Sequence, residues 1–202
     1  SGSGSDNRDI VLPVPGASGK YEWGGFRSVM DMPQAYNPAK HYIATANHNI
    51  MPKDFKLPLG YEWAAPFRFH RIDEVISNFT GKFTIPDFQK LQHDETSLPA
   101  RALTKVWHEV SNVPPDLQPF VRMLTEWDCV LHKDSAAASL YELWSPKLTA
   151  AVFKPSVPEK VWSQFATRIS LEKTIETLQF ASPKWFGDSG RAVRDRVMVA
   201  TL

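Results

Sequence analysis

The 202-residue chain has one cysteine, no long apolar run and almost no net charge. A single cysteine, Cys129, excludes an intrachain disulfide. We expect it to be a buried thiol rather than a nucleophile, because no histidine stands beside it in a known catalytic spacing. No stretch approaches the roughly 18 apolar residues that a membrane helix needs. The net charge of +1, with acids and bases interspersed, provides no basic face for nucleic acid. The sequence therefore predicts neither a membrane nor a nucleic-acid partner.

The composition changes along the chain in three steps. Residues 1–9 are rich in serine and glycine and predict a flexible linker. Residues 10–65 combine short β-leaning runs with loops that contain proline and glycine, and residues 66–202 carry apolar side chains at helical spacing. We expect an α+β fold class, with a short strand-and-loop segment followed by a mostly helical region. The last helix has no Gly or Pro to end it, so we expect the natural chain to continue.

Polar residues mark the starts of several expected helices. Thr84 is a candidate N-cap, with Asp87 three residues later, and Asp134-Ser135 precedes a helix expected from Ala136 to about Val152. Trp144 is large enough to anchor a helical core. These motifs predict packing and capping, and we assign them no chemistry.

The stretch from His41 to Asp73 has a different character. Tyr42 to Thr45 is apolar and favours a strand, and Ala46-Asn47-His48-Asn49 follows as a polar cluster that a strand does not require. After a loop, Trp63 to Arg68 leads into a helix. Strand ends and the loops beyond them often present catalytic groups on a rigid scaffold.

Several segments in the first two thirds of the chain resemble the penicillin-acylase family of N-terminal nucleophile amidohydrolases. The matching segments are Leu12-Pro13-Val14-Pro15-Gly16, Tyr21-Glu22-Trp23-Gly24-Gly25, Tyr36-Asn37-Pro38, Ile43-Ala44-Thr45-Ala46-Asn47-His48, Trp63 to Arg68, and Leu124-Thr125-Glu126-Trp127-Asp128. The resemblance implies an internal section of the β-subunit, within an αββα fold. It also implies a serine acyl-enzyme mechanism that hydrolyses N-acyl amides.

Asn47 matches the asparagine of the family's Ile-Ala-x-x-Asn segment. The resemblance implies that its side chain stabilises the oxyanion of the tetrahedral intermediate, a contribution of roughly 3–4 kcal/mol for such a donor. The alternative is a turn asparagine that bonds to its own backbone. Asn49 has no such match and is expected to be a turn residue. His48 occupies a position where relatives often have a second asparagine, and we expect it to be a loop residue rather than a base.

Arg68 matches the arginine that the family places after its Trp-rich segment. The resemblance implies an orienting and electrostatic role beside Asn47, the nucleophile's amino group or a substrate carbonyl. The alternative is a surface arginine near a helix start. The positive end of the helix dipole is an unfavourable site for a cation, which indicates that Arg68 has a partner elsewhere.

Asp54 is the one candidate metal ligand. By family resemblance it lies near a calcium position, but a calcium site needs several oxygen ligands and the sequence has no carboxylate cluster nearby. The alternative is a solvated loop acid. The proposed amide hydrolysis requires no cofactor, and calcium is possible only by family resemblance.

The nucleophile that the family requires is absent from the matching segments. Ser1 opens a Ser-Gly coil rather than a buried strand, and a nucleophile on a flexible tail would not be preorganised. We therefore expect the chain alone to be inactive. Its partners would be a companion α-subunit, the remainder of the β-subunit and a small N-acylated substrate. The resemblance implies a periplasmic or secreted enzyme, and the sequence leaves the cytoplasm open.

A second interpretation belongs to a different class. The chain would then be a non-catalytic helical binding or packing module derived from the family, with exposed aromatic residues such as Trp23, Tyr36 and Trp63 making its contacts. Asn47 and Arg68 discriminate between the two, because an enzyme segment should point both side chains into one cleft and a binding module has no reason to.

Overall fold

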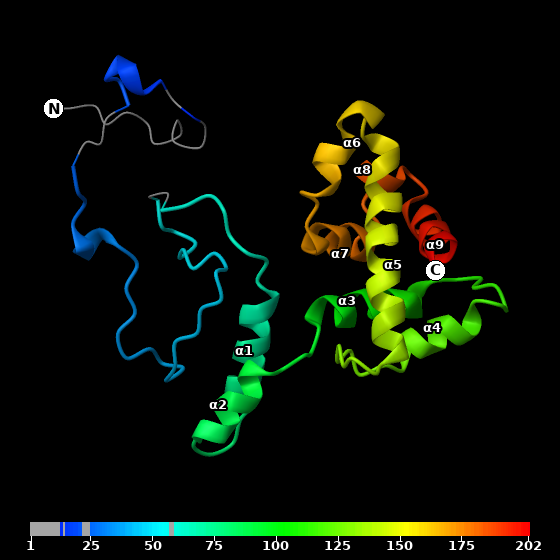
Figure 1. The fold of residues 1–202 in the computed structure, drawn as a ribbon, viewed down its shortest axis with the longest axis horizontal. Helices are drawn as coiled ribbons and strands as arrows, with labels where there is room; N and C mark the ends of the chain where they lie inside the picture. The colour runs from blue at the N-terminus through cyan, green and yellow to red at the C-terminus, as the bar shows by residue number, and fades with distance from the viewer. Residues whose placement is uncertain (1–12, 14, 22–24, 57–58) are drawn as a thin grey trace. The chain divides into compact units, whose positions relative to one another are not determined.

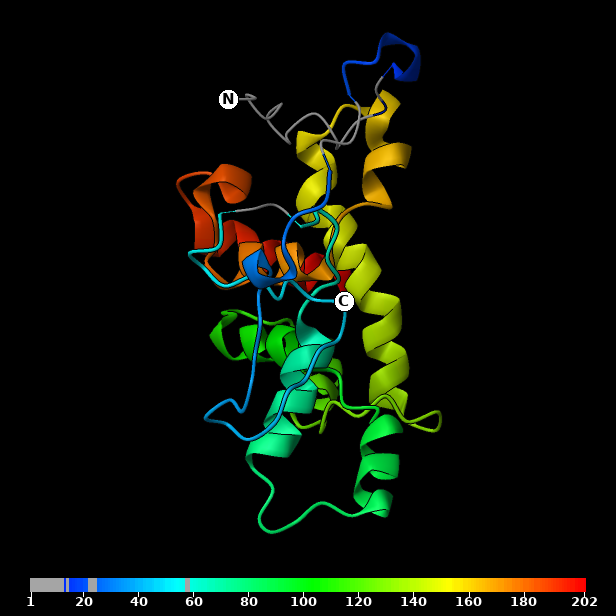
Figure 2. The same cartoon turned by 90° about the vertical axis from the view of Figure 1, so that its left-hand side faces the viewer.

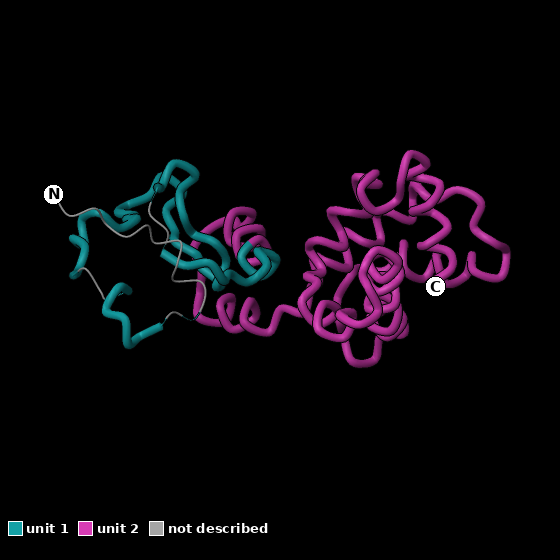
Figure 3. The backbone as a smooth tube through the Cα atoms, turned by 90° about the horizontal axis from the view of Figure 1, so that it is seen from above, with its two compact units in different colours: residues 1–69 teal, residues 70–202 magenta. Residues whose placement is uncertain are grey.

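A computed structural model describes residues 13, 15–21, 25–56 and 59–202, and divides the chain into two units. The first unit spans residues 1–69 and the second spans residues 70–202 (Figure 3). The expected linker at residues 1–9, Ser1 and Trp23 all lie outside the described residues.

The described part of the first unit is built from turns and irregular backbone. It contains two short 3-10 helices, η2 (Gly16–Ser18) and η3 (Val29–Asp31), and the beginning of α1. The expectation of a strand at Tyr42 to Thr45 is wrong for this structure, in which these residues have no regular secondary structure. A strand requires a neighbour that pairs with its N–H and C=O groups. Among the described residues the one β-bridge lies elsewhere, between Thr96 and Val130.

Helices dominate the chain from residue 67 onward (Figure 1). They are α1 (Phe67–Ser77), α2 (Ile85–Gln92), α3 (Leu98–Val106), η4 (Trp107–Glu109), α4 (Gln118–Thr125), α5 (Ala136–Phe153), η5 (Lys154–Ser156), α6 (Glu159–Ala166), α7 (Leu171–Gln179), α8 (Pro183–Phe186) and α9 (Gly190–Thr201). The predicted helical region is confirmed. None of these helices is both long enough and apolar enough to cross a membrane.

Side-chain caps explain where several helices begin. The Asp87 carboxylate accepts a hydrogen bond from the Thr84 backbone N–H at 2.8 Å, which confirms the predicted cap of α2. The Ser135 hydroxyl accepts from the Ala138 N–H at 3.2 Å, as predicted for α5. Ser97 and Ser170 cap α3 and α7 in the same way. Each cap satisfies a backbone donor that the helix itself leaves unpaired.

Helix α5 forms the centre of the second unit. It contacts α4, α7 and α9, and Figures 1 and 2 show it as the longest helix of this unit. Its inward face buries Tyr141, Trp144 and Leu148 almost completely. The Trp144 ring lies 5.6 Å from the Trp107 ring, and its indole N–H donates to the Thr201 hydroxyl at 3.0 Å. Trp144 therefore joins α5 to η4 and to the end of α9, as its size predicted.

An ion-pair network links α1, the end of α2 and α3. Arg71 binds Asp94 through two hydrogen bonds, of 2.7 and 3.0 Å, and binds Glu74 at 2.9 Å. Glu74 also accepts a hydrogen bond from Arg101 at 2.8 Å. The hydrogen bonds from Arg71 lower the pKa of Asp94 to about 2. Paired, bidentate contacts of this kind are stronger than single surface ion pairs.

The burial of Leu148 generates a stability prediction. Leu148→Ala removes a fully buried side chain from α5 and should lower the free energy of unfolding by about 2–5 kcal/mol, because a cavity remains. Leu143→Ala is the matched control on the same helix, since Leu143 is 69% exposed, and should change stability by less than about 0.5 kcal/mol. Urea unfolding followed by circular dichroism measures both. Equal effects of the two substitutions would contradict this placement of α5.

The Arg71–Asp94 pair generates a pH prediction. Because the folded-state pKa of Asp94 lies below its ordinary value of 3.8, the pair stabilises the fold above about pH 4, and this stability is lost as the pH falls through about 2. Asp94→Asn should therefore cost about 1–2 kcal/mol at neutral pH, reduced by partial exposure. The difference from the wild-type chain should shrink between pH 4 and 2. Asp188→Asn, at an exposed acid, is the control. If the loss of unfolding free energy in Asp94→Asn were the same at every pH, the lowered pKa assigned to Asp94 would be refuted.

Candidate functional site

A hydrogen bond joins the two residues that the sequence singled out. The Arg68 guanidinium, through Nη2, donates to Asn47 Oδ1 at 2.8 Å and to the Ala46 carbonyl at 3.2 Å. Arg68 is the second residue of α1, so the helix fixes its backbone. These two acceptors are the partners that a cation near a helix N-terminus was expected to need. The structure thus brings the predicted pair into direct contact within the first unit.

The contact with Arg68 fixes the orientation of the Asn47 amide. A guanidinium has only donors, so the amide oxygen must face Arg68 and the Nδ2 group must point elsewhere. Nδ2 makes no hydrogen bond with the residues that the structure describes. The side chain is also exposed. Asn47 therefore presents two N–H donors to solvent or to a ligand.

The Asn47 backbone has a left-handed conformation, with a φ of 61°. Asparagine adopts this region more readily than most residues. The Asn47 carbonyl accepts a hydrogen bond from the Ala64 N–H at 2.8 Å, which ties the polar cluster to the segment before α1. The turn alternative, a bond from the side chain to its own backbone, is not what Oδ1 does here, because Oδ1 binds Arg68.

The neighbours of Asn47 have different roles. Asn49 Oδ1 accepts a hydrogen bond from the Met51 N–H at 2.9 Å, which confirms it as a turn residue. His48 Nδ1 accepts from the Ala46 N–H at 3.4 Å. The His48 ring stacks on Phe69, with centroids 3.9 Å apart and planes 16° apart. His48 is thus a packed loop residue in this structure.

The arrangement offers donors and positive charge at one place. Besides Nδ2 of Asn47, the Nε and Nη1 groups of Arg68 make no hydrogen bond within the described part of the chain. Donors held in position beside a permanent cation are suited to an oxygen that gains negative charge. The pair has no group that would act as a nucleophile.

Cys129 does not supply that nucleophile. The thiol is buried, as predicted, and lies 3.8 Å from the Thr104 hydroxyl. Burial raises the pKa of this thiol, which disfavours the reactive thiolate.

Asp54 lies exposed in a turn that the Phe55 N–H closes on the Pro52 carbonyl at 3.0 Å. Among the described residues, no group of three or more His, Cys, Asp or Glu side chains is placed to hold a metal ion. Calcium binding near Asp54 stays a prediction of the family resemblance.

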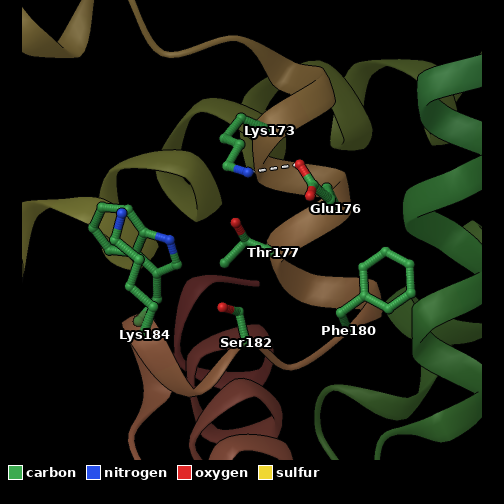
Figure 4. A pocket seen from close by; sticks show the side chains of 7 residues that line it. Lys173, Glu176, Thr177, Phe180, Ser182 and Lys184 are labelled. Carbon is green, nitrogen blue, oxygen red and sulfur yellow. Dashed lines mark hydrogen bonds and ion pairs between the residues drawn. The ribbon is translucent and has the colours of Figure 1, made fainter.

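A partly open pocket of about 290 Å³ lies in the second unit, beside α7 and α8. Figure 4 shows the side chains that line it: Lys173, Glu176, Thr177, Phe180, Ser182, Lys184 and Trp185. Lys173 is paired with Glu176 at 2.7 Å, and the Lys184 ammonium lies 5.2 Å from the centre of the Trp185 ring. Because both lysines already have partners and no predicted site residue lines the pocket, we assign it no function.

The sequence did not predict how the site is held together. The Ala64–Asn47 backbone bond and the His48–Phe69 stack were both missed. The sequence did carry a signal for the stack, because an aromatic residue directly follows each member of the pair: His48 follows Asn47, and Phe69 follows Arg68. Of the aromatic residues named for the binding-module interpretation, Tyr36 is 97% exposed and Trp63 is 37% exposed.

The sequence profile of a family described as penicillin amidase matches residues 4–202. An acyl-homoserine lactone acylase QuiP of Pseudomonas syringae pv. tomato is 30% identical over 158 residues, which cover 71% of this chain and 19% of that protein. A QuiP of Pseudomonas putida is 26% identical over 196 residues, covering 87% of this chain and 24% of that protein. The penicillin acylase 2 proenzyme of a Pseudomonas species is 30% identical over 143 residues, which cover 70% of this chain and 18% of that protein. The chain spans about a fifth of the length of these relatives.

Proposed function

Because the chain belongs to the penicillin amidase family, we propose that it is the oxyanion-stabilising part of an N-acyl amide hydrolase. Asn47 is the donor to the oxyanion and Arg68 holds and orients it. The observation that carries this proposal is the 2.8 Å hydrogen bond from Arg68 to Asn47 Oδ1, which leaves Nδ2 available to a substrate. The same contact favours an enzyme over the binding-module interpretation, since a packing module has no need of it.

The proposed reaction passes through an acyl-enzyme. A serine hydroxyl from another part of the enzyme attacks the amide carbonyl, and the serine's free α-amino group takes up the proton. An α-amino group has an ordinary pKa of about 8, so it can act as this base near neutral pH. The amine then leaves with a proton as the C–N bond breaks, and water hydrolyses the acyl-serine ester.

Asn47 acts in both halves of this reaction. Each tetrahedral intermediate places a negative charge on the former carbonyl oxygen, and Nδ2 donates to that oxygen. The Arg68 guanidinium keeps Nδ2 pointed outward and adds a fixed positive charge nearby. Because the donor is oriented before the reaction begins, little reorganisation is needed when the charge develops.

The proposed substrates are small N-acylated compounds. Relatives are named as acyl-homoserine lactone acylases and as a penicillin acylase, so N-acyl homoserine lactones and β-lactam side-chain amides are the two classes to assay. The proposed partners are a companion α-subunit and the remainder of a β-subunit, which would bring the nucleophile. A periplasmic or secreted location is part of this proposal and rests on the family resemblance.

Asn47→Ala tests the proposal in the assembled enzyme. It should lower kcat by about a hundred- to a thousandfold and change KM little, because the lost bond forms mainly in the transition state. Asn49→Ala is the matched control, since this asparagine lies two residues away and bonds only its own turn, and it should keep kcat within about threefold. Hydrolysis of both substrate classes is measured by release of the free amine. Full activity of Asn47→Ala would refute the role given to that residue.

A further inference from the structure

Two consecutive residues before the Pro- and Gly-containing loop face two consecutive residues of α1. Asn47 accepts the hydrogen bond of Arg68, and the next residue, His48, stacks on the next residue of the helix, Phe69. All four residues belong to the first unit. The polar contact and the ring contact therefore lie next to each other and join the same two segments.

Of the two contacts, the ring contact is the better protected from solvent. Asn47 and Arg68 are exposed, whereas His48 and Phe69 are half-buried. A hydrogen bond between exposed groups competes with water and contributes little by itself to holding a loop in place. Near-parallel rings 3.9 Å apart exclude water from both faces of the contact. The Lys40 ammonium, 5.6 Å from the centre of the Phe69 ring, adds a cation–π contact to the same helix residue.

His48 is also connected to the backbone that precedes Asn47. Its Nδ1 accepts from the Ala46 N–H at 3.4 Å, while the Ala46 carbonyl accepts from Arg68. Ala46 is 8% exposed, so this residue is fixed on both of its peptide groups in a buried position. Asn47, with its left-handed backbone, is thus bounded on one side by Ala46 and on the other by the stacked His48.

We propose that the His48–Phe69 stack is a positioning bracket that holds the Asn47 amide at the geometry needed for oxyanion donation. This inference rests on the proposed function, in which Asn47 is the donor. His48 is a positioning residue and not a catalytic one, because its Nδ1 already accepts a hydrogen bond from the backbone and its ring face is covered by Phe69. A displacement of about 1 Å at a catalytic group can cost as much as a hundredfold in rate.

The first experiment compares His48→Ala, His48→Tyr and His108→Ala in the assembled enzyme. His48→Ala removes the ring and should lower kcat about tenfold or more, with KM within about twofold. His48→Tyr keeps a ring that can stack on Phe69 but has no imidazole, and it should restore kcat to within about threefold of wild type. His108→Ala removes an exposed histidine of η4 and should change nothing.

A double-mutant cycle then tells whether His48 acts through Asn47. If it does, Asn47→Ala with His48→Ala should be no slower than Asn47→Ala alone. If the fold-loss of kcat in the double variant equalled the product of the losses in the two single variants, the proposal would be overturned, because His48 would then act independently of Asn47. An equal loss in His48→Tyr and His48→Ala would also overturn it, since the imidazole itself would then be required.

Hydrogen exchange of the Ala64 amide separates this inference from the proposed function. That amide donates to the Asn47 carbonyl, so its protection reports whether Asn47 is held in place, with or without catalysis. We expect its protection to fall about tenfold in His48→Ala and to stay unchanged in His48→Tyr. Unchanged protection in His48→Ala would overturn the bracket even in an active enzyme. If the Ala64 amide lost protection in His48→Ala and Asn47→Ala kept full activity, the bracket would be supported and the catalytic role of Asn47 would be refuted.

Discussion

A guanidinium only donates hydrogen bonds, and this restriction organises the segment between Ala46 and Arg68. Nη2 of Arg68 donates to the Ala46 carbonyl and to Asn47 Oδ1, although Arg68 and Asn47 are 21 residues apart along the chain. One cation at the start of α1 thereby contacts the polar cluster, in a part of the chain where the described residues form no strand. It also decides which end of the Asn47 amide faces outward. The orientation of the donor and the positive charge at the site both follow from this contact.

The second unit obtains its order from a different source, the burial of large side chains around α5. Trp144, Tyr141 and Leu148 are almost fully buried on it. The charged Arg194 of α9 is buried as well, at 1% exposure, and is paired with Glu109 and Asp195 at 2.8 Å each. A buried charge without such partners would cost several kcal/mol. The Arg194–Glu109 ion pair therefore links α9 to η4, in addition to the apolar contacts around α5.

The sequence predicted helices and caps well because both depend on neighbouring residues. Thr84 with Asp87 and Ser135 before α5 act as expected, and Cys129 is buried. The strand expected at Tyr42 to Thr45 failed because a strand depends on a partner that no local pattern specifies. Asn47 and Arg68 could be named from motif order, but their contact depends on how the loop folds back. The stacking of His48 on Phe69 was beyond reach for the same reason.

The single thiol gives the molecule a built-in reporter. Cys129 lies directly before the Thr96–Val130 bridge, and its own carbonyl accepts a hydrogen bond from the Ser97 N–H at 2.8 Å. With the thiol buried and its pKa raised, an alkylating reagent reaches it only when this junction between α4 and α3 opens. The rate of labelling would therefore report how often the structure opens locally between α4 and α3. No other cysteine in the sequence would contribute to the signal.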